Sequence, residues 1–120
     1  MYGLKEIKQM NKKGGIVIGK KKKKLPLEKE IQKQILAWLR KIGYSVDVIS
    51  SGLYNRSGIA DIVGCTGSGK FFAVEVKRGT NKPSALQVKW LEEKRDKGAY
   101  VYVANSLASL KEQMKKDMIE

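Results

Sequence analysis

The segment Phe71-Phe72-Ala73-Val74-Glu75-Val76-Lys77 is the most informative stretch of the sequence. Its apolar residues predict a buried strand that contains two charged side chains. Because side chains alternate across a strand, Glu75 and Lys77 are expected on the same face as Phe71 and Ala73. An unpaired buried charge is very costly, so the two charges must be paired or solvated. Taken alone, the segment is better explained by an ordinary ion pair of Glu75 with Lys77 on an edge strand.

A second acid lies in the segment that precedes this strand. Asp61 interrupts the apolar stretch Ile59 to Thr66, which predicts another strand, and Gly67-Ser68-Gly69 predicts a turn between the two. In such a β-hairpin, Asp61 is expected close to Glu75. Two neighbouring carboxylates repel each other unless a cation lies between them, and oxygen ligands suit Mg²⁺ or Mn²⁺.

Two helices place further polar side chains near these acids. In the helix expected from Leu27 to Ile42, Glu28 lies at the edge of the apolar stripe and Glu30 lies opposite it. The helix dipole also favours an acid in the first turn. In the helix that Ser84 begins, Gln87 lies on the buried side, and Ser84 and Gln87 also fit a capping box. A helix cap and a contact with the site therefore both remain open as roles for Gln87, and one residue could have both.

The order of predicted elements indicates an α/β fold. Further strands are expected at residues 44–50 and 100–104, and a closing helix at Leu107 to Ile119. The sequence thus predicts one domain, residues 25–120, with a mixed central β-sheet flanked by helices in the order αβββαβ plus a C-terminal helix. The tryptophans at helical spacing, Trp38 and Trp90, are expected in its core.

Composition points to a polyanionic partner. The 120 residues carry a net charge of +13, and residues 1–24 hold nine lysines and one acid. This basic arm is predicted to bind nucleic acid, although a merely solvated tail is the alternative. The absence of histidine excludes triads and zinc sites that need imidazole, and the single cysteine excludes a disulfide framework within the chain. No apolar run suits a membrane span, so a cytoplasmic protein is expected.

One motif is similar to a nucleotide-binding loop, but the residues that follow it do not fit that interpretation. Residues 64–70, GCTGSGK, match the pattern of a phosphate-binding loop. Such a loop is followed by Ser or Thr and a helix, whereas here Phe71 and a strand follow. A hairpin turn with an exposed Lys70 is the better interpretation, and no nucleotide cofactor is expected.

Taken together, these residues resemble the VRR-NUC branch of the PD-(D/E)xK nuclease superfamily over roughly residues 27–105. The motifs that carry the resemblance are Glu28-Lys29-Glu30-Ile31-Gln32, Arg56-Ser57-Gly58-Ile59-Ala60-Asp61, Glu75-Val76-Lys77 and Lys82-Pro83-Ser84-Ala85-Leu86-Gln87. Ala60 stands where the superfamily has a proline, a position that varies within this branch. The resemblance implies a restriction-endonuclease-like core and a metal-dependent phosphodiesterase.

The resemblance also implies a role for each site residue. Asp61, Glu75 and the Val76 carbonyl would hold Mg²⁺ or Mn²⁺, and Glu28 would join directly or through water. Lys77 would orient the attacking water, and Gln87 would position water or the scissile backbone. The residues expected to contact DNA are Lys20, Lys21, Lys22, Lys23, Lys24, Arg56, Ser57, Arg78 and Lys82.

The substrate follows from the resemblance less directly. Small stand-alone VRR-NUC proteins of phages and bacteria suggest resolution of four-way (Holliday) junctions by a homodimer, because two symmetric cuts need two sites. A nuclease that acts on flaps, nicks or duplex DNA is one alternative. A basic nucleic-acid-binding protein without catalysis is another, although carboxylates near phosphates oppose binding unless a metal bridges them.

Overall fold

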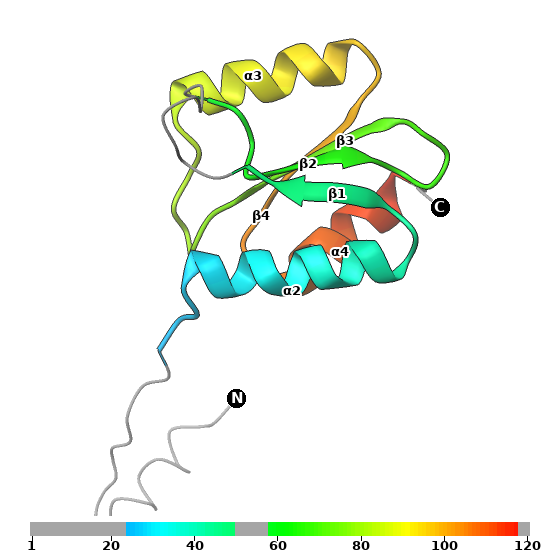
Figure 1. Cartoon of the computed structure of the whole chain (residues 1–120). Coiled ribbons are helices and arrows are strands. Elements are labelled where there is room, and N and C mark those ends of the chain that lie inside the picture. Colours follow the sequence, from blue (N-terminus) through cyan, green and yellow to red (C-terminus); the bar gives the residue numbers. More distant parts are fainter. Residues whose placement is uncertain (1–23, 50–57, 118–120) are drawn as a thin grey trace, which may run out of the picture.

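The computed structural model describes residues 24–49 and 58–117 (Figure 1). The elements, in chain order, are α2 (Glu28–Lys41), β1 (Ser45–Val48), β2 (Ile62–Cys65), β3 (Phe71–Val76), α3 (Ala85–Asp96), β4 (Tyr100–Ala104) and α4 (Leu107–Lys116). This order and the α/β class confirm the fold predicted from the sequence. No helix in the described part of the chain is both long and apolar enough to cross a bilayer.

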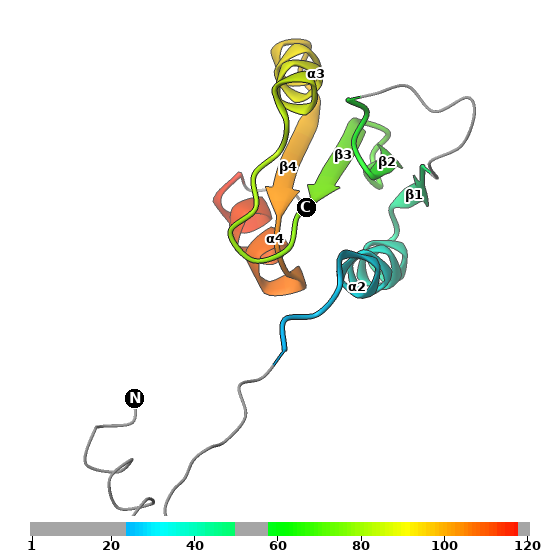
Figure 2. The same cartoon turned by 90° about the vertical axis from the view of Figure 1, so that its left-hand side faces the viewer.

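The sheet is mixed, as predicted. Its strand order is β1-β2-β3-β4, in which β2 is antiparallel to both β1 and β3, and β4 is parallel to β3. The helix α3 forms the crossover between the two parallel strands and covers one face, whereas α2 and α4 lie on the other (Figures 1 and 2). The central strand β3 therefore has helices on both sides.

The alternation of β3 divides the core as the sequence predicts. Phe72, Val74 and Val76 pack with α2 and α4, whereas Ala73 packs beneath α3 with Leu91. The ion pair of Glu75 with Lys77 is thus not on an edge strand. Only 1% of the Glu75 surface is exposed to solvent. The explanation of this segment as an ordinary, solvated ion pair on an edge strand is therefore wrong.

Both edge strands have backbone carbonyls occupied by side-chain donors. Arg40 donates from Nε and Nη2 to the Val46 carbonyl of β1, at 3.3 and 2.9 Å. On β4, Arg95 donates to the Val101 carbonyl at 2.7 Å, and Gln113 donates to the Val103 carbonyl at 2.9 Å. These carbonyls are not left as free acceptors along the sheet edges.

Some sequence-based boundaries differ from the structure. The strand expected at residues 59–66 is shorter, because only Ile62–Cys65 pairs with both neighbours, and Asp61 lies just before it. Trp38 and Trp90 are partly buried at the margin of the core rather than inside it. Lysines cover their rings, with Lys111 Nζ 5.0 Å from the Trp38 centroid and Lys94 Nζ 4.9 Å from that of Trp90.

The turn between β2 and β3 confirms the hairpin predicted at residues 64–70, GCTGSGK. The Thr66 hydroxyl accepts hydrogen bonds from the backbone N–H groups of Ser68 and Lys70, and the Thr66 carbonyl accepts one from Gly69. These amides, which a phosphate would need as donors, are turned into the hairpin itself.

Close packing of β1 against β2 requires a glycine at position 64. A Cβ added to Gly64 would collide with the Ser45 carbonyl oxygen and come within 2.6 Å of the Val46 Cα, both of them backbone atoms. We expect Gly64→Ala to lower the free energy of unfolding by about 1–3 kcal/mol, because β1 must shift. Urea denaturation measures the change. Gly67→Ala is the matched control, since its Cβ would meet only the Gly43 carbonyl oxygen at 3.8 Å, and equal losses in both variants would contradict the argument.

Candidate active site

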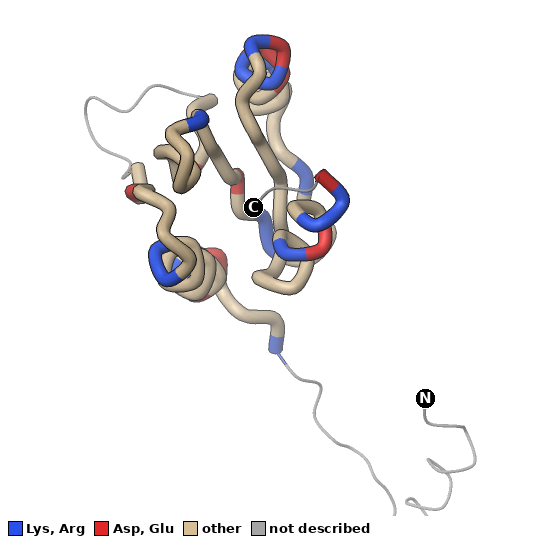
Figure 3. The backbone as a smooth tube through the Cα atoms, turned by 90° about the vertical axis from the view of Figure 1, so that its right-hand side faces the viewer, with Lys and Arg blue, Asp and Glu red and all other residues tan. Residues whose placement is uncertain are grey.

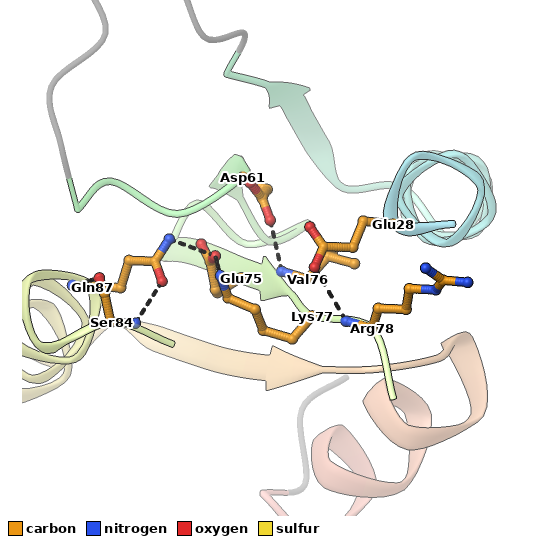
Figure 4. Close-up of polar contacts among 8 residues, drawn as sticks. All are labelled: Glu28, Asp61, Glu75, Val76, Lys77, Arg78, Ser84 and Gln87. Atoms are coloured by element: carbon orange, nitrogen blue, oxygen red, sulfur yellow. Dashed lines mark hydrogen bonds and ion pairs between the residues drawn. The ribbon is translucent and has the colours of Figure 1, made fainter. Parts of the chain in front are cut away.

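The predicted site residues gather where β3 ends. Glu75, Val76 and Lys77 come from β3 and its end, Asp61 from the residue before β2, and Gln87 from the first turn of α3 (Figure 4). Glu28 begins α2 and reaches the site from the other side of the sheet. Residues more than 50 positions apart in the sequence are thus assembled by the hairpin and the crossover.

Glu75 is the buried centre of the arrangement. Its Oε2 accepts a hydrogen bond from Gln87 Nε2 at 2.7 Å and lies 3.2 Å from Lys77 Nζ. Its Oε1 is buried and has no hydrogen-bond partner among the described residues. A buried acceptor without a partner is costly, which makes this oxygen a candidate ligand for a cation.

Burial and charge both act on the ionisation of Glu75. Desolvation, and next the neighbouring Asp61 carboxylate, raise the pKa of Glu75 to about 7, against the lowering effect of Lys77. Close to neutral pH, Glu75 thus gains or loses a proton easily. A bound cation would favour the ionised form and relieve the repulsion between the two carboxylates.

Asp61 is fixed by the backbone of β3. Its Oδ2 accepts a hydrogen bond from the Val76 N–H at 2.8 Å. Burial raises the pKa of Asp61, the bond from Val76 lowers it, and the charge of Glu28 raises it. Asp61 therefore interacts electrostatically with both other predicted acids: the charge of Glu28 raises the pKa of Asp61, and the charge of Asp61 raises the pKa of Glu75.

Glu28 is held at the rim of the site. Its Oε2 accepts a hydrogen bond from the Arg78 backbone N–H at 3.2 Å, a contact that joins α2 to the end of β3. The Arg78 guanidinium donates to the Leu25 carbonyl at 3.0 Å. Glu28 thus has a structural contact in addition to its favourable place at a helix N-terminus. Its neighbour Glu30 is exposed, as predicted, and accepts from the Leu27 N–H at 3.2 Å.

The three acids do not form one cluster. No group of three or more Asp, Glu or Cys side chains within residues 24–49 and 58–117 is arranged to hold a metal ion. Glu75 is turned toward Gln87 and Lys77, which bind its Oε2, whereas Asp61 and Glu28 lie on either side of the Val76 N–H (Figure 4). The pair Asp61 and Glu75 with the unpartnered Glu75 oxygen nevertheless fits a divalent cation in its donor chemistry.

Gln87 has both of the roles that the sequence left open. The Ser84 hydroxyl accepts from the Gln87 N–H at 3.2 Å, and Gln87 Oε1 accepts from the Ser84 N–H at 2.8 Å, which completes the capping box. The amide nitrogen of the same side chain binds Glu75. The cap therefore fixes the group that orients the buried carboxylate.

Gly58 lies next to the site, although the sequence indicated it only as part of a motif. Its φ of +93° suits glycine, and an added Cβ would lie 3.0 Å from the Leu86 carbonyl oxygen. The segment before Asp61 can therefore lie directly against the first turn of α3. A glycine three residues before the acid was the available signal for this close approach.

The predicted DNA contacts are only partly described by the structure. The residues Lys20, Lys21, Lys22, Lys23, Arg56 and Ser57 lie outside the part of the chain that the structure describes. Lys24 and Lys82 are exposed, as a contact with phosphate requires. Arg78 is half-buried, and its side chain is engaged by Leu25.

Removing the Gln87 side chain tests its double role. We expect Gln87→Ala to lower the free energy of unfolding by about 1–2 kcal/mol, because both the cap and the donor to Glu75 are lost. The phosphodiester cleavage that the family resemblance implies should fall about tenfold for the same reason. Thermal melting and initial cleavage rates measure the two effects. Ser84→Ala is the control that weakens the cap without touching Glu75. Equal losses of cleavage in both variants would show that Gln87 acts only through the helix.

Comparisons with known proteins found one matching family model and similar solved structures. The family model described as VRR-NUC domain matches residues 20–108. A solved structure titled "VRR_NUC domain" is 28% identical, with a TM-score of 0.63, and the match covers 73% of this chain and 94% of that one. A second, titled "VRR_NUC domain protein", is 14% identical, with a TM-score of 0.60 over 77% and 88% of the chains, and supports the fold alone. No curated protein matched the chain.

Proposed function

Since the chain belongs to the VRR-NUC domain family, which is a family of nucleases, we propose that it is a metal-dependent, structure-selective DNA endonuclease that hydrolyses phosphodiester bonds. The observation that carries the proposal is the buried Glu75 carboxylate. It has one oxygen without a partner and lies beside Lys77 and the second acid, Asp61. Such a group is costly in a protein that only binds nucleic acid.

VRR-NUC nucleases generally depend on a divalent metal, and this chain offers suitable ligands. We propose that Asp61, Glu75 and the Val76 carbonyl hold Mg²⁺ or Mn²⁺, with Glu28 joining directly or through water. Such an ion would supply a nucleophile at neutral pH and stabilise charge on the phosphate. Carboxylate and carbonyl oxygens are the ligands that these hard cations prefer.

The remaining side chains have roles that follow from their contacts. Lys77 brings a positive charge to the Glu75 carboxylate, where it is placed to orient water and to balance negative charge that develops on the phosphate. From the first turn of α3, Gln87 donates a hydrogen bond to the Glu75 carboxylate, and its own amide oxygen accepts one from the Ser84 N–H. Neither function needs histidine, which the sequence lacks.

We also propose that the substrate is a four-way DNA junction, which a homodimer of this protein resolves. A homodimer would present two sites and make paired cuts in a four-way junction. The nuclease domain would span residues 25–120, and the basic arm of residues 1–24 would bind phosphates beside it. Lys24, with which the described chain begins, is followed by Leu25, the residue that Arg78 binds next to the site.

Cleavage of defined DNA structures tests the function. The full chain is incubated with four-way junction, flap, nicked and linear duplex DNA in Mg²⁺, Mn²⁺ or EDTA. We expect paired symmetric nicks in the junction with either metal and none in EDTA. Asp61→Asn should remove cleavage and keep DNA binding. Preferential cleavage of flaps or nicks would reject the junction assignment, and cleavage in EDTA would reject metal dependence.

A further inference from the structure

A basic hollow lies at the end of the sheet opposite the carboxylates. It has a volume of about 480 Å³ and is lined by Lys70, Phe71, Lys94, Lys97, Gly98 and Ala99. Lys70 and Phe71 come from the β2–β3 turn and the start of β3, and the other residues come from the end of α3 and the segment after it. Figure 3 faces this end of the molecule and shows Lys and Arg on both segments.

Aromatic rings lie next to two of the three lysines that line this hollow. Phe71 is a large apolar side chain with 38% of its surface exposed, and its ring meets that of Trp90 edge-on at 6.2 Å. Lys94 Nζ lies 4.9 Å from the Trp90 ring centroid, and Lys70 Nζ lies 6.0 Å from that of Tyr100. An exposed aromatic ring beside positively charged side chains is typical of surfaces that bind single-stranded nucleic acid.

The lysines of the hollow lack acidic partners. The only ion pairs within the described part of the chain are Arg40 with Asp47 and Lys77 with Glu75. Three positive side chains around one hollow repel one another, so an anion that enters it would be stabilised.

One face of α3 connects this hollow to the carboxylate site. Gln87, Trp90, Lys94 and Lys97 follow one another at spacings of three or four residues, and Gln87 binds Glu75. On the sheet beneath, Phe71 and Glu75 lie on the same face of β3, four residues apart. This separation is about 13 Å along the strand, which equals about four base pairs of duplex DNA.

We propose that this hollow is a second DNA-binding site, which takes an unpaired nucleotide of the strand that passes the carboxylates. Its base lies against Phe71, and its neighbouring phosphates lie against Lys70, Lys94 and Lys97. The inference rests on the proposed nuclease function and adds to it a preference for DNA with unpaired bases near the cleavage point. Flaps and an opened junction centre offer such bases, whereas a continuous duplex does not.

Binding measured without cleavage tests the site. Fluorescence anisotropy in EDTA compares a fully paired duplex with a duplex of the same length that contains a short unpaired stretch. We expect Phe71→Leu to weaken binding to the second DNA about tenfold, the loss typical of one base–aromatic contact, and to leave binding to the paired duplex unchanged. Phe71→Tyr keeps an aromatic face and should bind as the wild type does.

The lysines have their own matched variants. Lys94→Gln combined with Lys97→Gln should weaken binding to both DNAs and reduce the salt dependence by about one phosphate contact for each lysine. Lys115→Gln combined with Lys116→Gln removes the same charge from the last turn of α4, on the other side of the sheet. This control should lose less affinity than the first pair, and thermal melting establishes that all variants are folded.

The outcomes separate the hollow from the nuclease function. Wild-type affinity of Phe71→Leu for both DNAs, or equal losses in the two lysine pairs, would overturn the second site while leaving the nuclease in place. A protein that cleaves no DNA, yet loses its preference for unpaired bases in Phe71→Leu, would overturn the nuclease and keep the site.

Discussion

The Glu75→Gln variant is expected to be more stable than the wild-type protein at pH 8 and to have lost cleavage. The carboxylate is almost fully buried, and burial together with Asp61 raises its pKa from 4.5 to about 7. Glutamine has nearly the same shape and no charge to bury. Its amide oxygen can still accept from Gln87, whereas it is a poor ligand for a divalent cation.

The sign of the pH dependence follows from the raised pKa of Glu75. In metal-free protein, the folded state holds this proton more tightly than the unfolded state between pH 4.5 and about 7. The stabilisation is therefore complete below pH 4.5 and is lost as the pH rises through about 7. The wild type should lose about 2–3 kcal/mol of unfolding free energy from this group between pH 5 and pH 8.

Urea denaturation in EDTA at pH 5 and pH 8 measures this loss in both proteins. In Glu75→Gln this loss of unfolding free energy between pH 5 and pH 8 should be absent. Glu93→Gln, a substitution at an exposed position of α3, should keep the pH dependence of the wild type. Cleavage should fall at least a thousandfold in Glu75→Gln, with DNA binding retained. Parallel pH curves of wild type and Glu75→Gln would show that the Glu75 carboxyl titrates normally.

Lys77→Met is expected to give the second large effect, with opposite consequences for stability. Its ammonium lies 3.2 Å from Glu75 Oε2, and 19% of its side-chain surface is exposed. Removing it leaves a buried carboxylate with one fewer compensating charge, so stability at pH 8 should fall by about 3 kcal/mol. Cleavage should fall 100- to 1,000-fold, because positive charge is missing where negative charge develops.

A double-mutant cycle separates the two roles of Lys77. If Lys77 stabilises the fold through Glu75, the Glu75→Gln background should remove most of the stability cost of Lys77→Met. Lys77→Arg keeps the charge and should recover more stability than activity, since water orientation depends on the position of the donor. Additive stability losses in the cycle would show that the two side chains do not interact.

The pattern of the sequence predicted most of the fold. The alternation around Val74 determined both faces of β3, and Ser84 with Gln87 marked the start of α3 correctly. These features depend on local periodicity and capping, which a sequence displays directly. The beginning of β2 was predicted too early, because the apolar Ile59 and Ala60 resemble strand residues although they form no ladder with β1.

The contacts of the candidate site were predicted only in part. The family resemblance placed Glu75, Lys77 and Gln87 in one site, and these three side chains are in contact. The turn of Glu75 toward Gln87, and the use of the Arg78 N–H to hold Glu28, depend on side-chain rotamers and on a contact 50 residues apart in sequence. Neither property has a local pattern. The close approach of Gly58 to α3 likewise depends on tertiary packing.

The occupied carbonyls at the two margins of the sheet restrict how copies of this protein can assemble. A strand from another molecule that aligned with β4 would have to displace Arg95 and Gln113, and one that aligned with β1 would have to displace Arg40. A continuous intermolecular sheet, the usual beginning of fibrous aggregation, is thereby disfavoured. A twofold partner would instead meet this protein through helices or through the β2–β3 hairpin, and would leave each sheet as a separate unit.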